Sequence, residues 1–305
     1  MANFIMLMGP SYSGKSTVAL ELQEELRKKG ELVEIMSSDN LREELYGDAS
    51  IQGDNGKLFS ELNDRTINAI RYGRSVIYDA TNLSAKKRIT LCKRVRNADP
   101  YVLRKLVVCC PPASVLYDRV ENSERERKVP KRVVNRQLMS FQSPCLAEGW
   151  DQIIMRGCVV DNYNYLDNIL EAFKEMEHDN PHHRLTITEH CYLAEKKVAD
   201  MMGDGSGAEL IKKAARYHDI GKFFTKTFTN TRGERTDAAH YYGHECLGAY
   251  LYLSYTGDKE GAWLITNHMR AYSWTDTAYH KFMAHSLEES LAQLKVLHEA
   301  DKEAH

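Results

Sequence analysis

The apolar run Phe4-Ile5-Met6-Leu7-Met8 leads directly into the loop Gly9-Pro10-Ser11-Tyr12-Ser13-Gly14-Lys15-Ser16, and helical spacing continues from there to Lys29. A buried strand, a glycine-rich loop and a helix form the unit in which backbone N–H groups surround phosphate oxygens. The glycines let these groups turn inward, the lysine supplies a charge to the transferred group, and the serine offers a hydroxyl ligand to Mg²⁺. We therefore expect a site for ATP and Mg²⁺ formed by Gly9, Ser13, Gly14, Lys15, Ser16 and Thr17.

Further apolar runs follow at Leu32–Met36, Val76–Tyr78 and Val102–Cys110, and helical stretches separate them. None of these runs alternates with polar residues, which is typical of strands buried on both faces. Strands that alternate with helices predict a parallel sheet flanked by helices. We expect this α/β domain to occupy residues 1–177, with strand signals ending after Pro112.

A polar break with a proline, His178–His183, precedes a second half of different character, and we place the domain boundary near Pro181. All twelve histidines lie after Glu177. The expected structure is an all-α domain over residues 182–305, because the segments after the break have helical periodicity. These segments are 188–202, 206–219, 238–255, 257–268 and 286–301.

The composition suits two medium-sized domains, since the chain has 305 residues of which 43% are hydrophobic. The net charge of −2 gives no global argument for nucleic-acid binding. Two local basic runs, at 86–96 and 125–136, could bind phosphate or could be solvated helix faces. The seven cysteines form no C-x-x-C pair, and no apolar stretch approaches the ~20 residues that span a bilayer. We expect a soluble cytoplasmic protein without membrane contact.

Two carboxylates follow predicted strands at the sheet edge where ligands bind in such folds. Asp39, in Ser37-Ser38-Asp39-Asn40-Leu41-Arg42, could accept a proton from a hydroxyl acceptor while Arg42 holds an acceptor phosphate. Alternatively, Asp39 caps a short helix over 40–46. The second carboxylate opens the stretch Asp79-Ala80-Thr81-Asn82.

Residues 1–150 resemble the bacteriophage polynucleotide kinases, which carry G-x-x-x-x-G-K-S, an aspartate with arginine three residues on, and a D-T-N motif. The resemblance implies that Asp39 is the general base and that Lys15 and Arg42 are catalytic, with Arg42 on the acceptor's phosphate. It also implies that Asp79 orients Asp39 and Arg42, and that Asp79 and Thr81 lie in the substrate site. The D-T-N motif has one extra residue here. The family's lid arginines correspond to Arg125-Glu126-Arg127-Lys128-Val129-Pro130, of which we expect Arg125 first, and Arg127 second, to contact the ATP phosphates. The stretch could instead be a surface loop.

The pair His218-Asp219 would suit Mn²⁺, Fe²⁺, Ni²⁺ or Co²⁺ if further ligands came from separate helices. Residues 183–305 resemble the HD-domain phosphohydrolases, whose ligands follow the order H, HD, H, H, D. The resemblance implies one metal held by His190, His218, Asp219 and Asp301, and a second held by His244 and His268. Lys222 could bind a substrate phosphate or be solvated. His240 is a rival ligand, since four residues separate it from His244 on a helix.

The other histidines are expected at the surface or behind the ligands, with His183 at the site entrance. The two resemblances together imply an end-healing enzyme that phosphorylates 5′-OH ends of RNA or DNA and hydrolyses a 3′-phosphate or a 2′,3′-cyclic phosphate. Nucleic-acid ends would be its partners, alongside a separate ligase. The alternatives are a nucleoside-type kinase joined to an HD nucleotidase, and an ATP-gated regulator.

Overall fold

The computed structural model describes residues 2–48, 51, 53–124, 128–180, 184–203 and 205–304. The chain forms two compact units. The first unit comprises Met1–Gln137 and Leu146–Gly157, and the second comprises Leu138–Cys145 and Cys158–His305. Helix α7 (Tyr163–Ala172) belongs to the second unit because it packs against α11 (His244–Thr256). Contacts therefore divide the chain before α7, upstream of the break expected near Pro181.

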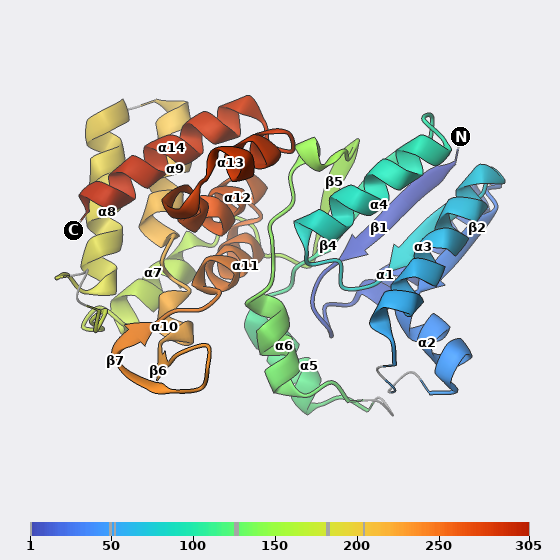
Figure 1. Cartoon of the computed structure of the whole chain (residues 1–305), viewed down its shortest axis with the longest axis horizontal. Helices are drawn as coiled ribbons and strands as arrows, with labels where there is room; N and C mark the ends of the chain where they lie inside the picture. The colour runs from blue at the N-terminus through green and yellow to red at the C-terminus, as the bar shows by residue number, and fades with distance from the viewer. Residues whose placement is uncertain are drawn as a thin grey trace. The chain divides into compact units, whose positions relative to one another are not determined.

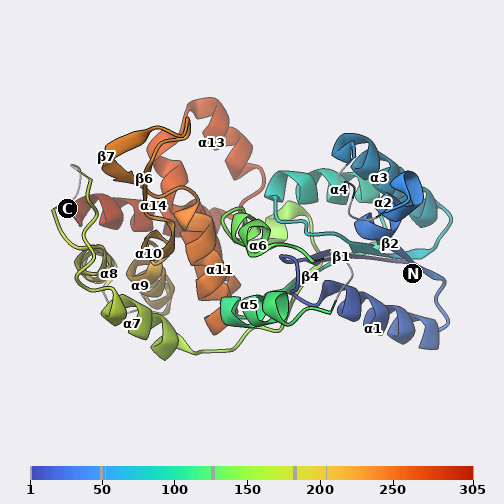
Figure 2. The same ribbon diagram turned by 90° about the horizontal axis from the view of Figure 1, so that it is seen from below.

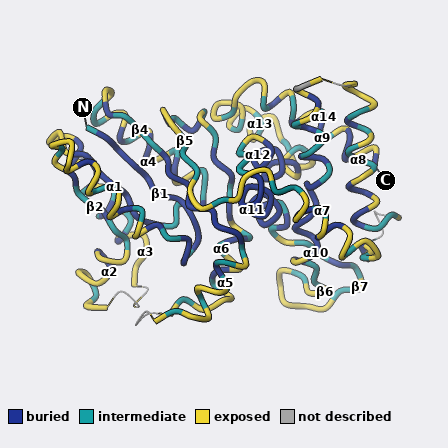
Figure 3. Tube along the Cα trace, turned by 180° about the vertical axis from the view of Figure 1, so that it is seen from behind, coloured by how far each residue is buried: buried dark blue, intermediate teal, exposed yellow. Residues whose placement is uncertain are grey.

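The first unit is built on a parallel sheet with the strand order β2-β3-β1-β4-β5, as counted over the described residues. The expected parallel sheet is confirmed. The central strand β1 is buried along its whole length, as the dark tube in Figure 3 shows. The strands are β1 (Asn3–Met8), β2 (Val33–Ser37), β3 (Ser75–Asp79), β4 (Leu103–Cys109) and β5 (Gln152–Arg156).

Strand β5 shows that the expected end of strand signals after Pro112 is wrong. It pairs with β4 at the edge of the sheet, from Lys105 opposite Gln152 to Cys109 opposite Arg156. An edge strand of five residues with polar ends carries little periodicity, so its sequence alone does not distinguish it from a helix segment.

Helices cover both faces of this sheet (Figure 2), with α3 and α4 on one side and α1 and α5 on the other. The apolar side chains of α1 pack with those of β1, β3 and β4 in one cluster that includes Leu7, Leu26 and Val107. The helices are α1 (Lys15–Lys28), α2 (Ser38–Tyr46), α3 (Asn55–Arg71), α4 (Ala85–Ala98), α5 (Ala113–Glu121) and α6 (Lys131–Leu138), with a 3₁₀ turn η1 (Leu146–Glu148). This packing places the loop after β1, the start of α2 and the end of β3 at one edge of the sheet (Figure 1).

The second unit is mostly helical, with a two-stranded antiparallel sheet of β6 (Thr227–Thr229) and β7 (Arg235–His240). The expected helical character of this half is confirmed, and these two short strands are an addition that the sequence did not predict. The helix expected over 238–255 begins only at His244, because Gly243, in a left-handed conformation with φ 72°, separates it from β7. The helices besides α7 and α11 are α8 (Ile187–Met202), α9 (Ser206–Tyr217), α10 (Lys222–Thr225), α12 (Lys259–Asn267), α13 (Asp276–Met283) and α14 (Glu288–Glu303), with a 3₁₀ turn η2 (His268–Ser273).

Helices α8, α9, α12 and α14 pack against one another, and α11 packs along α12. Helix α11 is buried on nearly every side, as its dark tube in Figure 3 shows. A helix this enclosed holds polar side chains away from water, which positions the site described below. None of the described helices is long and apolar enough to cross a membrane.

Candidate active sites

The phosphate-binding loop depends on two glycines. Gly9 has φ 152°, and a Cβ there would lie 2.4 Å from the carbonyl oxygen of Cys109. Gly14 is left-handed, with φ 91°, and caps the N-terminus of α1. Lys15 folds back over the loop, where its Nζ donates to the carbonyl of Pro10 at 2.8 Å. The two glycines therefore allow the close approach and the left-handed turn on which the phosphate-binding motif depends.

A pocket of about 500 Å³ opens beside this loop. The strand ends of β2 and β3 supply its polar side chains, as expected from the parallel topology. It brings together all the residues predicted for the acceptor side, namely Lys15, Ser16, Asp39, Arg42, Asp79 and Thr81.

Asp39 lies in the first turn of α2 and is paired with Arg42. The guanidinium donates from Nη1 to Asp39 Oδ1 at 3.0 Å and from Nη2 to Asn55 Oδ1 at 3.1 Å. The N-cap of α2 is Ser37, whose Oγ accepts from the backbone N–H of Asn40. The alternative in which Asp39 caps the helix is therefore wrong, and its carboxylate, 66% exposed, is open to the pocket.

Arg42 also has one donor without a partner. Its side chain is only 8% exposed, and its Nε makes no hydrogen bond to the described residues. A buried N–H group without an acceptor is costly, so the site is suited to an anionic ligand that supplies one.

Asp79, at the end of β3, accepts a hydrogen bond from Ser16 Oγ at 2.9 Å. The Arg42 guanidinium donates to Asp39 and Asn55 and not to Asp79, so the expected orienting contact from Asp79 to this arginine is not found among the described residues. Asp79 thus sits beside the hydroxyl that the loop motif assigns to Mg²⁺, and a hydroxyl next to a carboxylate is a donor set that suits this ion.

A second pocket, of about 880 Å³, also borders the loop and is lined by Gly14, Thr17, Asp118 and Arg119 among others. Arg119 Nη1 donates to the carbonyl of Tyr12 in the loop at 2.9 Å. The predicted lid residues Arg125 and Arg127 lie outside the described residues. Arg119 is therefore the described arginine that reaches the phosphate loop, and sequence spacing alone did not select it.

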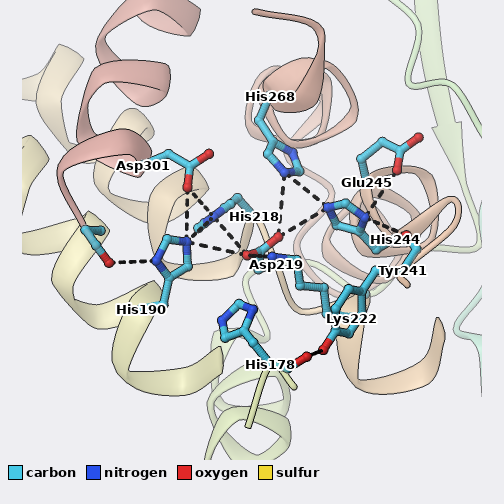
Figure 4. A network of polar contacts seen from close by, with 12 residues as sticks. His178, His190, His218, Asp219, Lys222, Tyr241, His244, Glu245, His268 and Asp301 are labelled. Carbon is cyan, nitrogen blue, oxygen red and sulfur yellow. Dashed lines mark hydrogen bonds and ion pairs between the residues drawn. The ribbon is translucent and has the colours of Figure 1, made fainter. Parts of the chain in front are cut away.

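The second unit gathers six side chains from α8, α9, α11, α12 and α14 and their ends into one buried cluster (Figure 4). His190 Nε2 lies 3.0 Å from Asp301 Oδ1 and 3.2 Å from His218 Nε2. His244 Nε2 lies 3.3 Å from both His268 Nε2 and Asp219 Oδ1. The cluster comprises His190, His218, Asp219, His244, His268 and Asp301, the six ligands that the sequence predicts.

Main-chain carbonyls orient all four imidazoles. The Nδ1 atoms of His190, His218, His244 and His268 lie 2.7 to 2.9 Å from the carbonyls of Ala304, Ala215, Tyr241 and Ile265. A carbonyl only accepts, so each Nδ1 carries a proton and each Nε2 faces the cluster. In this orientation Nε2 is the ring atom available to bind a cation.

Asp219 lies between two ligand groups. Its Oδ2 faces His190 and His218 at 3.5 and 3.3 Å, whereas its Oδ1 faces His244 and His268 at 3.3 and 3.6 Å. The two ligand groups, both of which Asp219 faces, are a donor set for one or two divalent ions. Imidazole and carboxylate donors suit Mn²⁺, Fe²⁺, Co²⁺ or Ni²⁺.

The electrostatics of the cluster also favour a cation. Burial opposes a charge on His218, but Asp219 and Asp301 outweigh burial and raise its pKa well above the ordinary value. Burial alone would raise the pKa of Asp219, yet His218 and Lys222 hold it well below its usual range. Two ionised carboxylates in a buried site thus keep a proton on His218. A bound metal ion would take the place of this proton.

Four further residues define the surroundings of this cluster. Lys222 is buried, and its Nζ lies 2.6 Å from Asp219 Oδ2, so it is not a solvated lysine. His178 is buried with its ring 5.6 Å from that of His190, which places it behind the ligands.

Tyr272 donates to Asp301 Oδ2 at 2.9 Å and was not expected from the sequence. The rival ligand His240 lies on β7 and is bonded to Thr236 instead, outside the cluster.

Comparison with known families agrees with this geometry. Residues 4–144 match the model of a family described as an AAA domain, and residues 187–304 match that of the HD domain. The protein joins an AAA domain that carries the phosphate-binding loop to an HD domain. The AAA domain carries the two pockets beside the loop, and the HD domain carries the six-residue cluster.

Solved structures of kinases are similar to part of the chain. The APS kinase of Mycobacterium tuberculosis, in complex with AMPPNP and APS, is 22% identical with a TM-score of 0.39, covering 56% of this chain and 98% of that chain. A gluconokinase from Sinorhizobium meliloti is 18% identical with a TM-score of 0.33, covering 50% of this chain and 81% of that chain. No curated protein matches the chain.

Proposed function

We propose that the protein is a nucleic-acid end-healing enzyme. Its AAA domain would phosphorylate 5′-OH ends of RNA or DNA with ATP, and its HD domain would remove a 3′-phosphate or open a 2′,3′-cyclic phosphate. The observation that carries the kinase assignment is the Asp39–Arg42 pair, which combines an exposed carboxylate with a buried arginine whose Nε has no acceptor among the described residues. A base next to an anion clamp suits an acceptor hydroxyl that has a phosphate nearby.

In the kinase step, Asp39 takes the proton from the acceptor 5′-OH while Arg42 holds the acceptor's own phosphate. The hydroxyl oxygen bonds to the γ-phosphorus, the bond from that phosphorus to the bridging oxygen breaks, and ADP leaves with the electron pair. Lys15 and the loop N–H groups stabilise the charge on the transferred group, and Arg119 lies against the same loop. Ser16 and Asp79 would hold Mg²⁺, which neutralises phosphate charge when bound.

In the HD step, the six-residue cluster would hold one or two divalent ions, which supply a hydroxide near neutral pH and polarise the phosphoryl oxygens. His190, His218, Asp219 and Asp301 form one ligand group, and His244 and His268 share Asp219 in the other. Lys222, ion-paired with Asp219, brings a positive charge to the edge of the cluster, where it can bind a substrate phosphate. Tyr272 fixes the orientation of Asp301.

The two reactions together convert a 5′-OH and a 3′-phosphate into the ends that a ligase joins, so we expect a separate ligase as a partner. We also propose a cytoplasmic location, which is supported by an odd number of cysteines, seven, without a C-x-x-C pair, a pattern typical of a reducing compartment.

The test is incubation with γ-labelled ATP and Mg²⁺ on 5′-OH oligonucleotides of RNA and DNA, with free nucleosides alongside. Label on the oligonucleotides supports the proposal. Label confined to nucleosides would indicate a small-molecule kinase joined to a nucleotidase, and label on neither would leave an ATP-gated regulator. A second assay follows phosphate release from 3′-phosphate and 2′,3′-cyclic phosphate ends with Mn²⁺, Co²⁺ or Ni²⁺, in the absence of ATP.

A further inference from the structure

Two side chains of the acceptor pocket have no role in the proposed kinase step. Phe59 projects from α3 and Lys87 from the first turn of α4, and both line the pocket that contains Asp39 and Arg42. The Lys87 Nζ lies 5.3 Å from the centroid of the Phe59 ring. The pocket wall therefore carries an aromatic face and a positive charge next to each other.

Lys87 differs from the other members of its basic run. Arg88 is fully buried in an ion pair with Glu148, and Arg94 is paired with Asp64. Lys87, in contrast, forms no ion pair with any described residue. Its contact with the half-buried Phe59 ring is weak, and its long flexible side chain allows Nζ to leave the ring for a stronger anionic partner.

We propose that Phe59 and Lys87 form a second acceptor subsite, in which the ring stacks on a nucleobase and the ammonium group contacts a phosphate beyond the one held by Arg42. An aromatic face beside a cation is the usual means of holding single-stranded nucleic acid, because bases stack on the ring while the backbone follows the charge. This inference rests on the proposed function, and it adds that the kinase prefers acceptors with at least two phosphates.

The experiment compares kcat/KM for a nucleoside 3′-phosphate, which has one phosphate, with that for a dinucleotide 3′-phosphate and a longer single-stranded oligonucleotide. For the wild type, kcat/KM should be higher with the two-phosphate acceptor than with the one-phosphate acceptor. Lys87→Ala should lower kcat/KM by on the order of tenfold more for the two-phosphate acceptor than for the one-phosphate acceptor. It should also reduce the slope of log(kcat/KM) against log[salt] by about 0.7, the value for one lost phosphate contact on a single strand.

Lys86→Ala is the matched control, because Lys86 is exposed on the same turn but does not line the pocket. Phe59→Leu should lower kcat/KM about tenfold for an acceptor with all its bases, and much less for an acceptor that lacks the base of its second nucleotide. Phe59→Tyr should retain activity, because it keeps the aromatic ring. The subsite would be disproved if Lys87→Ala lowered kcat/KM equally for both acceptors, or if it left the slope of log(kcat/KM) against log[salt] unchanged. Failure of the proposed function is a different result, namely no labelling of either nucleotide acceptor by the wild type.

Discussion

The Nε2 atoms of His190 and His218 lie 3.2 Å apart, while the Nδ1 of each ring is bonded to a main-chain carbonyl. Because each Nδ1 proton is committed to a carbonyl, two Nε2 atoms this close need a proton or a cation between them, since two facing lone pairs would repel. The same opposition occurs between His244 and His268 at 3.3 Å, on the other side of Asp219. The HD cluster is thus preorganised for positive charge at two positions.

The first prediction concerns metal content. Protein treated with a chelator and reloaded should bind two divalent ions per chain, as measured by calorimetry or elemental analysis. His268→Ala should reduce the content to one, because it removes a ligand from a single group, and Asp219→Ala should reduce it further, since Asp219 faces both groups. His240→Ala is the control and should keep both ions. A wild type that binds no transition metal would refute the assignment.

The second prediction concerns pH. Because the pKa of His218 is raised above its ordinary value of 6.5, its charge stabilises the metal-free fold fully below about pH 6.5 and ceases to do so as the pH rises through the higher folded pKa. Metal-free protein should therefore unfold at progressively lower temperature as the pH rises above that range. In metal-loaded protein the cation replaces the proton, so this loss should disappear. Parallel thermal melts of the two forms test it, and identical pH profiles would contradict it.

The third prediction separates the two activities. Asp39→Asn should lower the kinase rate by roughly 10²- to 10⁴-fold, because it removes the general base, and should leave phosphate release unchanged. Asp219→Ala should do the reverse. Glu43→Gln, an exposed change on the same helix as Asp39, should affect neither activity. If either aspartate variant lost both activities while remaining folded, the assignment of one reaction to each domain would be wrong.

The fourth prediction concerns stability. Arg88 is fully buried and donates to Glu148 from Nε and Nη2, and Trp150 Nε1 donates to the same carboxylate. Arg88→Ala leaves the buried Glu148 carboxylate without its ion-pair partner and should lower the free energy of unfolding by about 3–5 kcal/mol. Arg94→Ala removes an exposed pair on the same helix and should cost about 1 kcal/mol or less. Urea denaturation compares the two, and equal losses would show that burial does not decide the cost.

The local sequence was sufficient to predict the motifs whose conformation depends on residues close together in the chain. The loop around Gly9 and Gly14 needs conformations that its own residues determine, so its motif predicted the strand, the turn and the helix that the structure contains. The six HD residues were predicted from the resemblance to HD-domain phosphohydrolases, whose ligand order this half of the chain follows, and the structure brings all six together.

Only the tertiary structure decided which residues from distant segments of the chain contact one another. The placement of β5 beside β4, the approach of Arg119 to the phosphate loop and the bond from Tyr272 to Asp301 each join residues far apart in the chain. His240 was a plausible ligand only while it was expected on the helix of His244, and its place in β7 removes it. The sequence alone therefore determined which chemical groups the protein possesses, because motifs and periodicity are local. Only the packing of strands and helices decided which of those groups meet, because that packing is set by burial and pairing across the whole chain.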